Sequence, residues 1–270
     1  MKVTSRFFLP LMTLWMALSS PAALAQTDDY DRFSLSFGVF FTDRETDTRI
    51  DSSIGPPGSD LDMEEILGLD KTDSVFRIDG AFRFAPKHQL NISAFDLSRE
   101  ATVTLLQDIS VGETMFPAGT EVDTDFDLGI YKIDYTWRFV QRDNGFFGVT
   151  GGLYIADMDI TIDAPNVPLI RPELNGATAP LPVLGFRGQY DFSEKWSFYA
   201  DAEIFFFEYG DVDGSLYDVY AGLDYSFSEH VALGIGINSV KMDLGVSKTD
   251  LSGALDWQYE GALLFLKFDW

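Results

Sequence analysis

The sequence predicts an all-β fold, an antiparallel up-and-down transmembrane β-barrel of about ten strands, with eight strands as the smaller alternative. Many segments alternate apolar and polar residues with a period of two, which is the periodicity of a β-strand. The connections alternate between short turns and longer links, and after residue 25 no apolar run reaches the ~18 residues that a transmembrane helix needs. A chain without such a helix crosses a bilayer only as a closed barrel, because its backbone polar groups must bond to one another.

The N-terminal segment has the pattern of a secretory signal peptide. Lys2 and Arg6 are followed by an apolar stretch, and Ala23-Leu24-Ala25 fits a cleavage site. We therefore expect residues 1–25 to be removed and residues 26–270 to form a single barrel domain. The absence of cysteine excludes disulfides, thiolate metal sites and a cysteine nucleophile. The net charge of −24 argues against nucleic acid as a partner, because phosphate binding needs a basic surface.

Strand periodicity first appears at Phe33–Phe41, where apolar residues alternate with small and polar ones. Two later segments are less regular. The phase slips near Ala94–Phe95 and again near Asn238–Ser239, and either a β-bulge or a wrong strand boundary would explain each slip. The clearer strands lie near residues 76–84, 133–139, 147–155, 184–192, 196–204, 217–227, 231–237 and 264–270.

The predicted connections differ systematically in length. Tight turns lie near residues 85–88, 141–145, 193–195 and 228–230, and longer links near 43–72, 106–121, 163–180, 209–214 and 247–252. In an outer-membrane barrel the short turns are periplasmic and the longer loops are external. Within the first link, Ser59 and Asp62 resemble a helix cap and Gly68 a helix stop, so we expect a short amphipathic helix near residues 60–67. This helix either packs on the barrel rim or folds into its mouth.

The third link, near residues 163–180, is rich in proline. This composition predicts an extended, stiffened loop that could contact a partner. The prolines are Pro165, Pro168, Pro172, Pro180 and Pro182.

The alternation leaves open whether the apolar face points outward or, as in a soluble barrel, inward. The opposite face is rich in glycine and in charges of both signs, which can pair across a lumen, so we expect the apolar face to point outward. Aromatic residues also cluster beside the short turns, as in the belt that marks a membrane–water interface. The predicted lumen charge network comprises Arg77, Asp79, Arg83, Lys132, Asp134, Arg138, Arg187, Asp201, Glu203, Asp218 and Asp224. The predicted aromatic belt comprises Phe84, Trp137, Phe139, Tyr190, Phe192, Trp196, Phe198, Tyr225, Phe227 and Trp270, with Trp257 and Tyr259 expected in an opposite belt.

The last residues carry a resemblance. Leu264, Leu266 and Phe268 alternate to a terminal Trp270, which resembles the C-terminal assembly signal of Gram-negative outer-membrane proteins that the barrel assembly machinery reads. With the signal peptide and the hairpin pattern, the chain resembles small outer-membrane barrels of the OmpA, OmpX and OmpW kind, without pointing to a characterised subfamily. The resemblance implies export through the general secretory pathway and a place in the cell outer membrane among membrane lipids and lipopolysaccharide. It departs from OmpA in lacking a periplasmic peptidoglycan-binding domain.

No constellation in the sequence predicts catalysis. Enzymes among the small barrels use a histidine at the external end or the outer surface, whereas His88 and His230 both fall in expected periplasmic turns. We therefore expect no catalytic residues, no cofactor and no dedicated metal site. The acidic external links could hold divalent cations, but they lack the ligand spacing of a calcium loop. These acids are Asp43, Glu45, Asp47, Asp51, Glu113, Glu121, Asp123, Asp125, Asp127, Asp211 and Asp213.

These observations predict a monomeric integral barrel with a structural or surface-interaction role and a largely filled polar lumen. The alternative is a narrow outer-membrane channel for small or apolar solutes. About ten strands is only slightly above the size at which side chains fill a barrel interior, so the two hypotheses differ in how completely the lumen is blocked.

Overall fold

The computed structural model describes residues 31–52, 57–111, 113–164 and 173–247, and residues 251–270. The predicted signal peptide, residues 1–25, lies outside the described residues, as do Pro165, Pro168 and Pro172 of the third link. Within the described ranges, no helix is long and apolar enough to cross a membrane.

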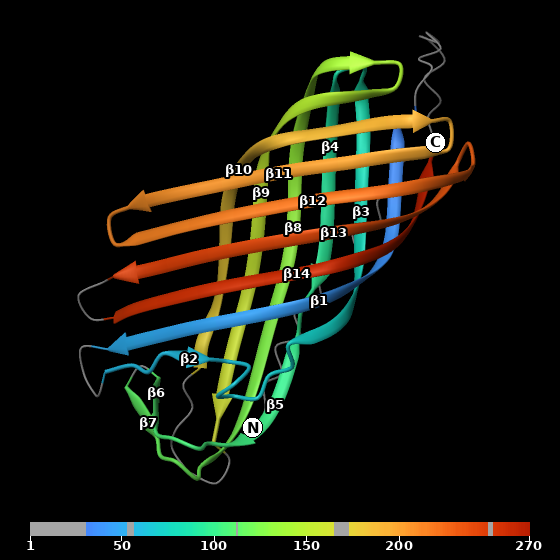
Figure 1. Cartoon of the computed structure of the whole chain (residues 1–270). Coiled ribbons are helices and arrows are strands. Elements are labelled where there is room, and N and C mark those ends of the chain that lie inside the picture. Colours follow the sequence, from blue (N-terminus) through green and yellow to red (C-terminus); the bar gives the residue numbers. More distant parts are fainter. Residues whose placement is uncertain (1–30, 53–56, 112, 165–172, 248–250) are drawn as a thin grey trace, which may run out of the picture. The chain divides into compact units, whose positions relative to one another are not determined.

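The described chain is almost entirely β-structure (Figure 1). The strands are β1 (Phe33–Ser52), β2 (Leu61–Asp62), β3 (Thr72–Ala85), β4 (His88–Asp96), β5 (Arg99–Thr104), β6 (Ile109–Val111), β7 (Thr114–Phe116), β8 (Glu121–Arg142), β9 (Gly145–Asp163), β10 (Glu173–Ser193), β11 (Trp196–Tyr209), β12 (Val212–Ser228), β13 (Val231–Ser247) and β14 (Leu251–Asp269).

Antiparallel pairing of each strand with its neighbours closes a ten-strand barrel, which confirms the predicted fold class. The barrel strands are β1, β3, β4 and β8 to β14, and β14 closes the sheet against β1. Strand β5 continues the line of β4 alongside β8, β2 pairs with β1 beyond the end of β3, and β6 and β7 form a separate hairpin. All four tight turns predicted from the sequence join consecutive barrel strands at one end. We call this the turn end and the opposite end the loop end.

The strands are longer at the loop end than the sequence predicted. Residues 43–52 and 173–180 were assigned to links, but they belong to β1 and β10. The acids at 121–127, expected around the second link, belong to β8. Pro180 and Pro182 therefore lie in a strand rather than in a loop. The predicted helix near residues 60–67 is also wrong, because β2 is followed there by a single turn closed by the Ile66 N–H donating to the Asp62 carbonyl.

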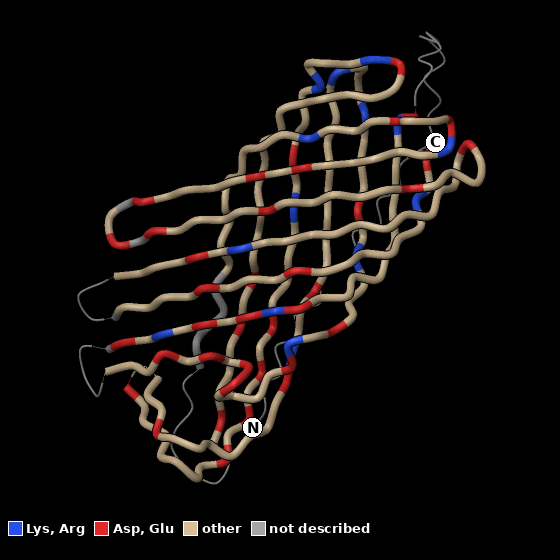
Figure 2. The backbone as a smooth tube through the Cα atoms, viewed as in Figure 1, with Lys and Arg blue, Asp and Glu red and all other residues tan. Residues whose placement is uncertain are grey.

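The outward face of the barrel strands is apolar near the turn end and polar near the loop end. On β1, exposed Phe37, Val39 and Phe41 are followed on the same face by Asp43 and Glu45. We call the outward-facing apolar zone the apolar band. The band ends at equivalent heights on other strands. There the last outward apolar residue and the next outward polar residue are Phe76 and Ser74, Ile155 and Asp157, Phe206 and Glu208, Ile237 and Ser239, and Ala262 and Glu260. Figure 2 shows how Asp and Glu crowd the loop end beyond this border.

The inward face changes in the opposite sense at the same border. Near the turn end it carries small and charged residues such as Ser36 and Asp79, whereas beyond the border it becomes a hydrophobic core. Fully buried members of this core include Met63, Leu67, Leu97, Val122, Phe126, Leu128, Met242 and Trp257. The barrel is therefore apolar outside and polar inside at one end, and polar outside and apolar inside at the other.

This exchange of faces explains the two apparent phase slips and one incorrect prediction. No register shift occurs at Ala94–Phe95 in β4 or at Asn238–Ser239 in β13, so neither apparent phase slip is a bulge. The strands keep their phase while the chemistry of the two faces is exchanged. Trp257 and Tyr259 do not form an outward belt, because they lie on the inward face and are fully buried.

Candidate functional site: the lumen and its closed mouth

Alternation along five barrel strands brings most of the predicted charge network together inside the apolar band. Lys132 of β8 is its main ammonium group. Its Nζ lies 2.6 Å from Glu203, 2.9 Å from Asp218 and 4.0 Å from Asp201. All four side chains are buried, so each charge depends on its partners for compensation.

Arg187 of β10 extends this network across the lumen. Its guanidinium lies 3.0 Å from Asp134 on β8 and 2.6 Å from Asp201 on β11. Asp134 also accepts hydrogen bonds from Asn91 Nδ2, at 2.7 Å, and Thr150 Oγ1, at 2.8 Å. The network thus joins strands on opposite sides of the barrel, which leaves its members little freedom to move apart.

The remaining predicted network residues lie nearer the two ends. Asp224 pairs at 2.6 Å with Lys267, a residue that the predicted network did not include although the alternation of the last strand places it on this face. Arg83 lies at the turn end, where its guanidinium donates to the Pro86 carbonyl. Arg138, also at the turn end, hydrogen-bonds Gln89 and lies over the ring of Phe146. These two arginines line the turn-end entrance and are not part of the Lys132 cluster.

A layer of aromatic rings lies between the charge network and the hydrophobic core. The guanidinium carbon of Arg77 lies 5.8 Å from the ring centre of Phe40 and 5.3 Å from that of Phe95, within cation–π range. Tyr259 packs edge-on against both phenylalanines and donates from its hydroxyl to Asn238 Oδ1. Arg77 also pairs with Asp79 at 2.9 Å. All three rings are buried inside the barrel just below the mouth.

The mouth itself is closed by the first link. Met63 and Leu67 are fully buried in the hydrophobic core, so this segment folds into the mouth, the second of the two placements considered from the sequence. Glu64 lies between them, where it pairs with Arg99 of β5 and accepts the Thr46 N–H at 2.9 Å. Arg99 also donates to the Thr46 hydroxyl. Sequence reasoning missed this ion pair, because its partners lie 35 residues apart and Glu64 is on an irregular segment.

The predicted aromatic belt lies on the outward face at the turn end. Its members are exposed, except for the half-buried Tyr225, and neighbouring rings contact one another. Trp137 and Phe139 have ring centres 5.9 Å apart, and Trp196 and Tyr225 5.0 Å apart. Aromatic rings exposed at one height around a barrel are typical of a membrane–water interface.

The predicted assembly-signal residues lie in or just after β14. Leu264 and Leu266 face outward, as does Trp270, whose backbone exchanges hydrogen bonds with Phe33 of β1. This segment therefore forms the closing seam of the barrel.

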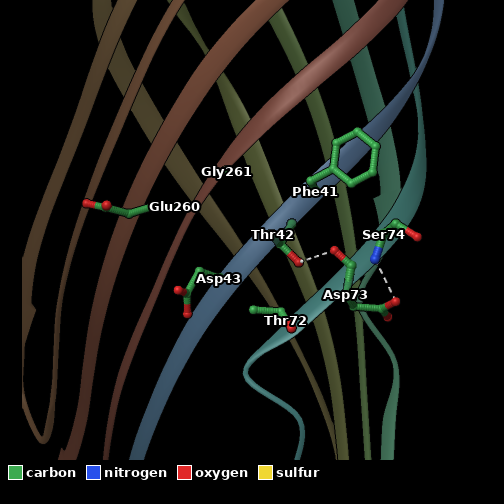
Figure 3. A pocket seen from close by; sticks show the side chains of 8 residues that line it. All are labelled: Phe41, Thr42, Asp43, Thr72, Asp73, Ser74, Glu260 and Gly261. Carbon is green, nitrogen blue, oxygen red and sulfur yellow. Dashed lines mark hydrogen bonds between the residues drawn. The ribbon is translucent and has the colours of Figure 1, made fainter.

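An open pocket of about 670 Å³ marks the border of the apolar band on the outer wall (Figure 3). Phe41 lies on its apolar side, and Asp43, Asp73 and Glu260 lie on its acidic side. Asp43 and Glu260 are direct cross-strand partners, a placement of like charges that is unfavourable without compensation. The residues that line the pocket supply three carboxylates and the hydroxyls of Thr42, Thr72 and Ser74, and include no histidine.

The two histidines lie at the turn end, as the sequence predicted. His88 begins β4 and stacks on Phe84 and Tyr135, and His230 lies in the turn before β13. Among the described residues, no three His, Asp or Glu side chains are grouped so that they could hold a metal ion. Most of the acids considered for cation binding lie on the outward faces of β1 and β8 rather than in loops.

Comparisons with known proteins support the fold. No family model matches the chain, and no curated protein matches it. Among solved structures, the outer-membrane protease OmpT from Escherichia coli is 13% identical, with a TM-score of 0.59, covering 93% of this chain and 100% of that one. The outer-membrane protein OprG from Pseudomonas aeruginosa is 11% identical, with a TM-score of 0.38, covering 89% of this chain and 96% of that one. The predicted resemblance to small outer-membrane barrels is thus confirmed at the level of fold, and no subfamily is indicated.

Proposed function

We propose that this protein is a non-catalytic barrel of the Gram-negative outer membrane that holds a closed, acidic structure above the bilayer. The turn end is then periplasmic and the loop end external. The apolar band supports this location, because exposed Phe, Leu and Ile side chains around a whole barrel are stable only against lipid. The outward acids beyond the band form a surface available to partners outside the cell.

The observation that supports this proposal is the succession of buried side chains along the barrel interior. A solute entering from the loop end meets the hydrophobic core around Met63, then the ring layer around Arg77, then the ion pairs of Lys132. Opening a route through the Lys132 cluster would separate buried charges, which costs several kcal/mol for each uncompensated ion. The filled-lumen hypothesis is therefore favoured over a narrow channel through the barrel axis.

Single-channel recording in a planar bilayer tests this proposal. We expect no reproducible conductance steps from the purified protein, with an open porin in the same bilayer as positive control. A difference in gel mobility between boiled and unboiled samples shows that the inserted protein is folded. Reproducible steps from the folded protein would overturn the closed-lumen proposal.

The fold shared with a protease calls for a separate test of the non-catalytic role. In this chain both histidines lie at the turn end, away from the acidic external surface. We expect no cleavage when the folded protein is incubated with a mixed peptide library in lipopolysaccharide-containing micelles. Cleavage that disappears when His88 and His230 are replaced by Gln would show that the protein is an enzyme.

A further inference from the structure

Strands β10 and β11 separate before they reach the loop end. Their ladder runs from the turn at Ser193 and Trp196 to the pair Leu184–Ile204, and no later pair joins them. Both strands nevertheless continue, β10 alongside β9 as far as Glu173 and β11 alongside β12 as far as Tyr209. Within the described residues, the barrel wall therefore has a seam between these two strands.

The seam begins inside the apolar band. In the same register, Val183 and Phe205 would pair next, followed by the outward pair Pro182 and Phe206. Phe206 belongs to the band, with 59% of its surface exposed. Leu184 and Ile204, which form the last pair, are 67% and 47% exposed. An unpaired strand edge at this height faces hydrocarbon, where unbonded backbone groups are costly.

On the β10 side, two prolines reduce the number of unbonded backbone N–H groups along this edge. Pro180 and Pro182 keep their pairing with Ile155 and Leu153 of β9, so their missing N–H groups fall on the side that faces β11. Proline at alternate positions removes the donors that a continued ladder would need. The sequence itself therefore ends the β10–β11 ladder at this point.

A second early-ending ladder in the barrel wall is covered. Strands β1 and β3 also diverge, but their ladder ends at Asp43–Thr72, outside the apolar band, and β2 pairs with β1 beyond it. Figure 1 shows the strand direction changing sharply at both places, between β1 and β3 and between β10 and β11. Among the described residues, no strand pairs into the β10–β11 seam.

We infer that the seam between β10 and β11 binds an acyl chain of a membrane lipid. The inward residues that flank it, Leu181, Val183 and Phe205, are buried and apolar. The outward residues Leu184, Ile204 and Phe206 are continuous with the lipid-facing band. No charged residue lies on either strand between this last pair and the band border at Glu208. The seam is thus apolar on both faces and continuous with the lipid-facing band, so an acyl chain can pack along it.

Photolabelling with a phospholipid that carries a diazirine in the middle of one acyl chain tests this inference. The protein is reconstituted in bilayers of this lipid, illuminated and mapped by mass spectrometry. We expect label on the outward band and also on the inward residues Val183 and Phe205. The matched control is Val240, which is equally buried and inward but lies on β13, where both ladders are continuous. Label on Val183 and Phe205 that does not exceed label on Val240 would overturn the inference.

A reversible lock distinguishes the slot from a generally loose wall. The chain has no cysteine, so two introduced cysteines have no native thiol to react with. In Pro182→Cys combined with Phe206→Cys, an intramolecular disulfide joins the two strand edges across the seam. Oxidation of this pair should abolish the label on Val183 and Phe205, and reduction should restore it, with each single variant unaffected by oxidant. Label on Val183 and Phe205 that persists in the locked protein would show that the lipid does not reach them through the seam.

Discussion

At the scale of single residues, the closed mouth depends on few polar contacts within an apolar core. Two buried guanidiniums, those of Arg44 and Arg99, share this core with one buried carboxylate, Glu64. Glu64 pairs with Arg99, whereas Nη2 of Arg44 lies 3.6 Å from the half-exposed Asp73. The core therefore has little spare negative charge, and removing Glu64 leaves two cations close together.

Replacing Glu64 with Ala should loosen the first link without unfolding the barrel. Breaking a buried ion pair by removing one partner costs about 3–5 kcal/mol, because the other charge remains buried and uncompensated. We expect proteases to cut residues 57–71 of this variant much faster than in the wild-type protein, while gel mobility still shows a folded barrel. Glu65→Ala is the matched control, because Glu65 is exposed. Equal cleavage of the two variants would show that the ion pair does not hold residues 57–71 in the mouth.

Protonation of Asp47 should tighten the attachment of β2 to β1. Burial raises the pKa of Asp47, and the neighbouring carboxylates Asp62 and Asp256, its cross-strand partners, raise it further. A carboxyl with a raised pKa in the folded state binds its proton more tightly there than in the unfolded state. Its contribution to stability is therefore present in full at low pH and is lost as the pH rises through the folded-state pKa.

Hydrogen exchange measures this effect. We expect the backbone amides of residues 61–69 to exchange more slowly, after correction for intrinsic rates, as the pH falls from 7 toward 4. In Asp47→Asn, exchange should already be slow at pH 7 and should change little with pH. Asp70→Asn, which alters an exposed acid outside this carboxylate row, should behave like the wild-type protein. A pH dependence that survives in Asp47→Asn would assign it to another group.

At the scale of the strands, sequence periodicity predicted which segments pair but not where they end. The apolar band, the four short turns and the lumen position of Lys132 and Arg187 all follow from alternation within about ten residues. The loop-end half of β1 was taken for a link because its outward face carries acids in place of apolar residues, and that of β10 because of its prolines. The Glu64–Arg99 pair depends on a contact between distant segments, which a local pattern does not record.

The inward position of Trp257 is directly testable with lipids that carry bromine on their acyl chains, which quench nearby indoles. Variants that retain either Trp257 or Trp137 as the single tryptophan of residues 31–270 are reconstituted in such lipids. Trp137 is 49% exposed in the aromatic belt and should be quenched strongly, whereas Trp257 is fully buried inside the barrel and should not be. Equal quenching would place Trp257 on the outward face and would contradict the register of β14.

At the scale of the whole barrel, the exchange of faces sets how far it stands above the bilayer. On β8 the outward apolar residues end near Tyr131, and the strand continues from Ile130 to Glu121 with Asp123, Asp125 and Asp127 on the outward side. At about 3.4 Å per residue and a strand tilt of about 40°, this segment adds roughly 25 Å of height. Because its interior is a packed hydrophobic core, the projecting wall should behave as a rigid body.

Atomic force microscopy of the protein in a supported bilayer measures this projection. We expect one face to protrude by about 25 Å, from the estimate above, and the other to lie nearly flush, since only two-residue turns extend beyond the belt there. In Glu64→Ala the height of the protruding wall should persist, because the ladders of β8, β9, β13, β14 and β1 hold the wall. Only residues 57–71 are loosened in this variant. Equally low protrusion on both faces would mean that the acidic strand ends lie down on the membrane, and the closed structure proposed above it would not exist.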